Sequence, residues 1–121
     1  MPLGYSDNVN TVAETPQFQK KAKRLLSIIE KEDLIAHLAV NPKAGVLIEG
    51  TGGIRKLRWG HADKGKSGGV RVIYYYHSEI MPLYLLTVFG KNERANISQQ
   101  EKQTLAKTVD QLVDYWRRRN G

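Results

Sequence analysis

The sequence predicts an α+β fold in which two N-terminal helices and a C-terminal helix pack against a twisted, mostly antiparallel four-stranded sheet. Two observations carry this prediction. Apolar residues recur at three- and four-residue spacing near both ends of the chain, which is the period of an amphipathic helix, and the middle of the chain holds short alternating or continuous apolar runs bounded by glycines. With 121 residues the chain is long enough for one core, so residues 1–121 are expected to form a single domain, with residues 1–8 as a loose N-terminal extension.

The N-terminal part begins with a weak strand signal over 8–13 and continues into two helices. Thr15 followed by Pro16 predicts a helix start, since threonine caps a helix and proline suits its first position. Apolar residues from Phe18 to Ile29 keep helical spacing, and basic residues occupy the outer positions between them. A second helix is expected over roughly 31–40, ending where Asn41 precedes Pro42.

The remaining elements are strands and one long helix. A short extended piece at 46–48 leads through the glycines of 50–53 into two strands at 54–59 and 70–76, and the almost continuously apolar run 82–89 reads as an interior strand buried on both faces. Ser98 and Glu101 form a capping-box pattern that opens the last helix. We expect the helices to cover one face of the sheet.

The chain is basic, with 19 Lys/Arg against 12 Asp/Glu, a net charge of +7 and a pI near 9.7. Such a balance favours nucleic acid, the ribosome, an acidic partner or a membrane surface. The absence of cysteine excludes disulfides, thiolate catalysis and cysteine-bound zinc. The three histidines lack metal-ligand spacing, so no metal and no cofactor is expected, and without a signal sequence or long apolar stretch a cytoplasmic location is expected.

The strongest functional signal is basic residues on the two middle strands. Lys56 and Arg58 alternate with apolar residues and therefore share one face of their strand, and Arg71 joins them if the strands pair. An anionic backbone would fit on that face, although basic residues on an exposed strand also protect against aggregation. The tyrosines 74–76 are expected to pack in the core rather than to stack on bases.

A literal phosphate-loop pattern spans Gly60 to Ser67. We interpret it as a hairpin loop, because phosphate binding there requires a helix directly after the Lys-Ser pair, whereas two glycines and a strand follow. Lys64 and Lys66 are still expected to contact an RNA backbone as simple charges.

Three strand motifs, Gly50 to Arg58, Gly68 to Tyr75 and Leu85 to Glu93, resemble the RelE/ParE superfamily of bacterial toxins, in particular its HigB-like branch. The resemblance covers roughly 15–113. It implies a RelE fold and the toxin of a type II toxin–antitoxin system: an endoribonuclease (mRNA interferase) that cuts messages on the translating ribosome without metal. The ribose 2′-hydroxyl would attack the adjacent phosphate. The resemblance also implies a cognate antitoxin as partner, with DNA contacted only through the antitoxin.

The same resemblance assigns expected roles. Lys56, Arg58, Arg71 and Lys91 are the expected catalytic residues, Arg71 at the scissile phosphate and Lys91 in place of an arginine that the family carries at Asn92. Crowding by Arg58 and Arg71 would favour a neutral Lys56 amine, and so a general base. The family's first strand lysine is Ile54 here, and its C-terminal tyrosine has no counterpart, Ser98 standing near that position. The expected RNA-binding residues are Arg55, Lys64, Lys66 and Asn92.

Other functions remain open. Relatives with this fold inhibit DNA gyrase without any nuclease activity, which makes a ParE-like gyrase inhibitor the leading alternative. A non-catalytic RNA-binding domain comes next and would show salt-sensitive binding without cleavage.

Overall fold

The computed structural model describes residues 9–60 and 69–120, which form three helices and a five-stranded sheet. In chain order these are β1 (Val12–Glu14), α1 (Pro16–Leu25), α2 (Ile28–Val40), β2 (Val46–Leu47), β3 (Ile54–Trp59), β4 (Val70–Tyr75), β5 (Leu83–Gly90) and α3 (Gln99–Asn120). The sheet order is β1-β5-β4-β3-β2, with β1 parallel to β5 and all other neighbours antiparallel. The α+β class is confirmed, but the prediction of four strands is wrong, because β1 adds a fifth, parallel strand.

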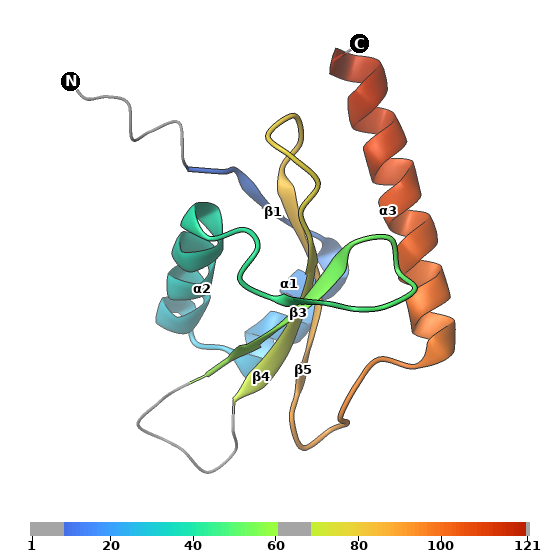
Figure 1. The fold of residues 1–121 in the computed structure, drawn as a ribbon. Coiled ribbons are helices and arrows are strands. Elements are labelled where there is room, and N and C mark those ends of the chain that lie inside the picture. The colour runs from blue at the N-terminus through green and yellow to red at the C-terminus, as the bar shows by residue number, and fades with distance from the viewer. Residues whose placement is uncertain (1–8, 61–68, 121) are drawn as a thin grey trace, which may run out of the picture.

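The helices cover both faces of the sheet, so the expectation of a single covered face is also wrong (Figure 1). Phe18 of α1 and Leu34 and Leu38 of α2 are fully buried against one face, together with Val72 and Tyr74. The opposite face carries α3, whose core contacts are Leu105 and Val109 against Ile54, Ile73, Leu86 and Phe89. Strand alternation explains the division, since successive residues of β3, β4 and β5 point to opposite layers. Removing one of the large buried side chains, such as Phe18, is expected to cost about 3–5 kcal/mol.

Local signals set the helix ends. The Thr15 hydroxyl accepts a hydrogen bond from the Phe18 amide, as the Thr-Pro pair predicts. The boundary between the first two helices was predicted too late in the chain, because α1 ends at Leu25 and α2 begins at Ile28. A complete capping box of Ser27 and Glu30 starts α2 there.

Tyr74 links β4 to the segment that precedes β2. Its hydroxyl donates to the Pro42 carbonyl at 2.9 Å and accepts from the Gly45 amide at 2.8 Å. A side chain on residue 45 would collide with the Tyr74 ring, so glycine is needed there. Tyr74 and Tyr75 are both buried, which confirms that they belong to the core.

Residues 1–8, predicted to be a loose extension, lie outside the described part of the chain. The described helices include none that is both long and apolar enough to cross a membrane.

Candidate functional site

Strands β3 and β4 bring three of the four expected catalytic residues to the face that α3 covers. Ile54 of β3 is buried in the α3-side core, and Lys56 and Arg58 follow it at two-residue spacing, so they point to the same side. The antiparallel register places Arg58 directly opposite Arg71, and Arg71 directly opposite Phe89 of β5. The predicted convergence of Lys56, Arg58 and Arg71 on one face is therefore confirmed.

Two arginines therefore face each other across neighbouring strands. Like charges directly opposite each other on neighbouring strands repel, and a sheet without a functional demand would avoid the pair. Arg58 is exposed, and Arg71 is half-buried with its guanidinium 3.4 Å from the Val70 carbonyl oxygen. The face thus holds concentrated positive charge at the loop end of the β3–β4 hairpin.

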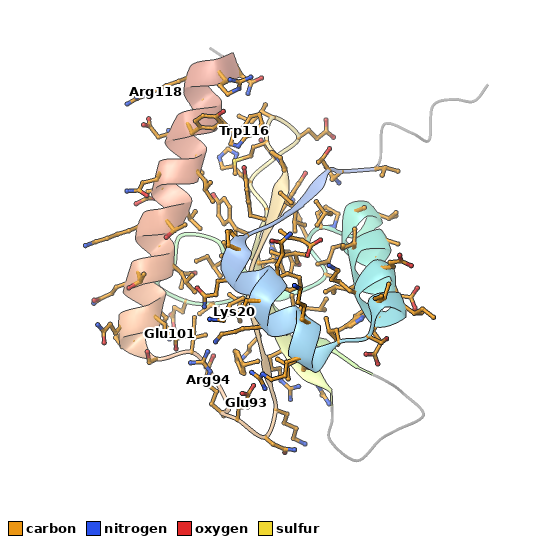
Figure 2. All side chains as sticks on the ribbon, turned by 180° about the vertical axis from the view of Figure 1, so that it is seen from behind. Lys20, Glu93, Arg94, Glu101, Trp116 and Arg118 are labelled. Atoms are coloured by element: carbon orange, nitrogen blue, oxygen red, sulfur yellow. The ribbon has the colours of Figure 1, made fainter. Side chains whose placement is uncertain are left out.

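A fourth cation, Arg94, extends the same row. Its guanidinium carbon lies 4.5 Å from the centre of the Phe89 ring, and its side chain forms an ion pair with Glu101 in the first turn of α3. Figure 2 shows Arg94 and Glu101 close together, where the segment after β5 turns into α3. We call Lys56, Arg58, Arg71 and Arg94 together the basic face.

Glu101 stabilises the start of α3 in addition to pairing with Arg94. Its carboxylate accepts from the Ser98 amide at 3.0 Å, and the Ser98 hydroxyl accepts from the Glu101 amide at 3.1 Å, which confirms the predicted capping box. Partial burial raises the pKa of Glu101, but the hydrogen bonds from Arg94 and Ser98 outweigh it and lower the pKa below its usual value.

Asn96 connects this segment to the sheet. Its side-chain oxygen accepts from the Lys56 amine at 3.3 Å and from the Ile97 amide at 3.0 Å, while Ile97 is buried in the α3-side core. The segment between β5 and α3 therefore reaches across the sheet to β3 and restrains the Lys56 amine.

Lys91 and Asn92 lie at the exit of β5. Both are exposed, and they line a shallow depression with Leu25 and Leu26 at the end of α1. Next to them, the Glu93 carboxylate accepts from the Gly90 amide at 2.6 Å and pairs with Arg24 at 3.1 Å; the Gly90 bond, followed by Arg24, lowers the pKa of Glu93. Lys91 and Asn92 are thus at the margin of the basic face.

The structure does not bring Arg55 to this face. Its guanidinium donates to the carbonyls of Lys43 at 3.3 Å and Gly45 at 2.8 Å, on the side of the sheet that α1 and α2 cover. Lys64 and Lys66, the other two expected RNA-binding lysines, lie outside the described residues.

Sequence reasoning missed Arg94, Asn96 and Glu101 as parts of the site. The available signal was a basic residue between the end of a buried strand and a capping box, which would have placed Arg94 near the strand ends. Within 9–60 and 69–120 no group of three histidine or acidic residues is arranged to hold a metal ion. What the basic face offers chemically is positive charge and proton-carrying amines.

Two comparisons with known proteins agree with this fold. Residues 11–117 match the family model described as the RelE toxin of the RelE/RelB toxin–antitoxin system. The solved structure of an E. coli RelE toxin, an arginine-to-alanine double mutant in the free state, is similar over 84% of this chain and 97% of that chain, with a TM-score of 0.54 and 15% sequence identity. That likeness concerns the fold, whereas the family model spans most of the sequence. The chain belongs to the RelE family of toxins, the toxin component of toxin–antitoxin systems.

Proposed function

We propose that this RelE-family toxin is a ribosome-dependent mRNA endonuclease of the HigB-like branch that acts in the cytoplasm and is neutralised by a cognate antitoxin. The observation that carries the proposal is the placement of Arg58 directly opposite Arg71, beside Lys56 and Arg94, on one face of the sheet. Two guanidinium groups placed in this way can bind the oxygens of one phosphate group between them.

Cleavage would proceed through the RNA itself. The 2′-oxygen of the ribose forms a bond to the adjacent phosphorus, the bond from phosphorus to the 5′-oxygen breaks, and one proton leaves the 2′-hydroxyl while another reaches the 5′-oxygen. The protein must orient the chain, stabilise the added negative charge and move these protons. No metal is required for any of these tasks.

The residues divide these tasks by position. Arg58 and Arg71 would bind the phosphate oxygens, with Arg94 adding charge at the end of the row. Lys56, restrained by Asn96, would take the 2′-hydroxyl proton, and Lys91 at the exit of β5 would stabilise or protonate the leaving oxygen. Asn92, Lys64 and Lys66 would contact the backbone farther along the RNA. Arg55, bonded to two carbonyls on the other face, would hold the segment before β2.

We expect dependence on the ribosome because the described part of this face offers few groups that could act as a general acid or a general base. Of the described histidines, His37 packs on Trp59 at 5.2 Å between ring centroids, and His77 lies exposed beyond β4 beside Ser78. Glu101 is paired to Arg94. Because the described residues of this face include no histidine and no carboxylate outside an ion pair, efficient cutting would require an RNA already held in a reactive geometry, which the ribosome would supply.

The test is a cell-free translation reaction in which 5′ ends on the message are mapped with the wild-type toxin, with Arg71→Ala and with Arg117→Ala, a control that removes a cation from the end of α3. We expect codon-phased cuts with the wild type and the control, and none with Arg71→Ala. Intact message at full translation would refute the proposal, and inhibition of DNA supercoiling by gyrase under the same conditions would support the ParE-like alternative. Replacing Lys56 with methionine and finding full cleavage would refute the base assigned here.

A further inference from the structure

Helix α1 presents a second set of cations that the proposed cleavage does not use. Its ten residues, Pro16–Leu25, include four basic side chains and no acidic one. Phe18 is fully buried and fixes the inward side of the helix. Lys20 and Lys23 lie about 200° and about 140° around the axis from Phe18, so both point outward, and both are exposed. Lys21, partly exposed, flanks them.

Within the described residues, these lysines form no ion pair. The two nearby acidic residues already form ion pairs, Glu14 with Lys31 at 3.0 Å and Glu93 with Arg24 at 3.1 Å. The charge of Lys21 helps to lower the pKa of Glu93, but the two side chains form no ion pair. Across the described chain no carboxylate forms an ion pair with Lys20, Lys21 or Lys23. We call these three residues the α1 basic patch.

The α1 basic patch costs stability in the isolated protein. Lysines three residues apart on a helix repel each other, and the helix dipole compensates only those in the last turn, where Lys23 lies. The C-terminal turns of α3 show a different arrangement, because Arg118 there pairs with Asp114 and Arg119 lies over the Tyr115 ring. Repulsion on so short a helix, which no described carboxylate offsets by an ion pair, would be relieved by an anionic partner outside the chain.

The α1 basic patch and the basic face belong to different layers of the molecule. α1 packs on the sheet face that holds Val72 and Tyr74, whereas the basic face is on the α3 side. Figure 2 shows α1, with Lys20 labelled, in front of the sheet, and the lower end of α3 near Glu101 beside it. One strand of RNA on the basic face therefore leaves the patch free for a second contact.

The side chains of the patch are suited to binding the phosphate backbone of a nucleic-acid helix. A shallow depression there is lined by Pro16, Gln19 and the lysines 20, 23 and 31. It offers ammonium and amide donors for phosphates but no aromatic ring for stacking on single-stranded bases, since Phe18 is buried. It also lacks the apolar pockets that anchor a bound peptide.

We propose that the α1 basic patch is a second RNA-binding surface that contacts the phosphate backbone of double-helical RNA while the basic face holds the strand to be cut. The identity of the partner as RNA rests on the proposed function. Together the two surfaces would clamp the toxin between a folded RNA and its substrate.

The test compares two triple variants with the same change in net charge, from +7 to +4. Lys20→Gln, Lys21→Gln and Lys23→Gln together remove the patch. Arg117→Gln, Arg118→Gln and Arg119→Gln together remove three cations from the end of α3. Binding to message-programmed ribosomes and to a short RNA duplex is measured over about 0.05–0.2 M salt. Thermal unfolding confirms that both variants fold, and glutamine preserves helix propensity.

We expect the α1 variant to bind both probes at least tenfold more weakly, with a salt slope smaller by about 2–3, because each phosphate contact contributes about 0.9. The α3 variant should bind as the wild type does, and arginine at positions 20, 21 and 23 should restore binding. Equal behaviour of the two glutamine variants would overturn the inference. So would an α1 variant that keeps ribosome binding but escapes its antitoxin, since the patch would then hold an acidic peptide.

The outcome separates this inference from the proposed function. If the wild type binds ribosomes through α1 but never cuts the message, the cleavage proposal fails and the second RNA surface stands. If the wild type cuts and the α1 variant binds and cuts equally well, the second surface fails and the cleavage proposal stands.

Discussion

Replacing Arg58 with glutamine is expected to make the protein more stable and less active at once. The residue lies directly opposite Arg71, at a separation of about 5 Å between Cβ atoms for such cross-strand pairs. Two unit charges at about 5 Å in a water-like dielectric repel by about 0.8 kcal/mol, and splaying of the two side chains reduces this, so we expect a gain of about 0.5 kcal/mol. The substitution relieves this repulsion and leaves Arg71 in place.

Urea denaturation provides the assay for stability. The free energy of unfolding falls by about 1–3 kcal/mol per molar urea, so the urea concentration at the midpoint of unfolding should rise by about 0.3 M at low salt. At about 1 M salt the Debye length falls to about 3 Å, and the gain should disappear. Arg117→Gln, which removes an equal charge from the end of α3, should give no such gain.

Cleavage in the translation assay provides the second readout. Losing one charge-stabilising donor from the phosphate site should lower the rate by about 10²–10³-fold. An Arg58→Gln protein that is less stable than the wild type at low salt, or that cuts at the wild-type rate, would refute the reasoning. An equal rise in midpoint for Arg117→Gln would attribute the effect to net charge alone.

Three further substitutions test the framework of the site. Tyr74→Phe leaves the buried Gly45 amide without its acceptor and should cost about 1–3 kcal/mol in urea denaturation; an unchanged midpoint would contradict the assigned bond. Glu101→Gln should cost about 1 kcal/mol at neutral pH. Because folding lowers the pKa of Glu101, its carboxylate stabilises above the unfolded value of about 4.3, and this stabilisation is lost as pH falls through the lower folded value. Thermal unfolding across pH should therefore show the two proteins converging in acid, and a constant difference would argue against the pair. Asn96→Ala frees the Lys56 amine and should lower the cleavage rate about tenfold and shift its pH profile, with stability changed by less than about 0.5 kcal/mol; an unaltered profile would exclude Asn96 as a positioning residue.

Elements with local signals were predictable from the sequence. Thr15 and Pro16 start α1, Ser98 and Glu101 start α3, and the continuous apolar run of β5 is buried on both faces, as expected of an interior strand. The break between α1 and α2 was missed because the apolar spacing runs on through Leu26 to Ile29, although the capping box at Ser27 is an equally local signal. The parallel pairing of β1 with β5 is a contact between distant segments, which no local pattern encodes.

The same distinction holds for the candidate site. Lys56, Arg58 and Arg71 were predictable because strand alternation and hairpin pairing fix their side of the sheet. The local signal places Arg94 only near the strand ends, and the contacts of Arg94 and Asn96 depend on the path of an irregular segment that is held by Glu101 and Ile97. The opposite orientation of Arg55 follows from the same alternation that brings Lys56 and Arg58 together, so the sequence contained that information as well.

The pairing of β1 with β5 also affects when this protein becomes active during its own synthesis. The Thr15 hydroxyl donates to the Leu85 carbonyl across 70 positions of sequence, so the earliest strand cannot join the sheet until the last one has been made. Arg71 also needs β5, because its cross-strand partner is Phe89, and Arg94 and α3 follow β5 in the chain. A nascent chain emerging from a ribosome therefore lacks the completed basic face for most of its translation, which separates the making of the toxin from its attack on the machinery that makes it.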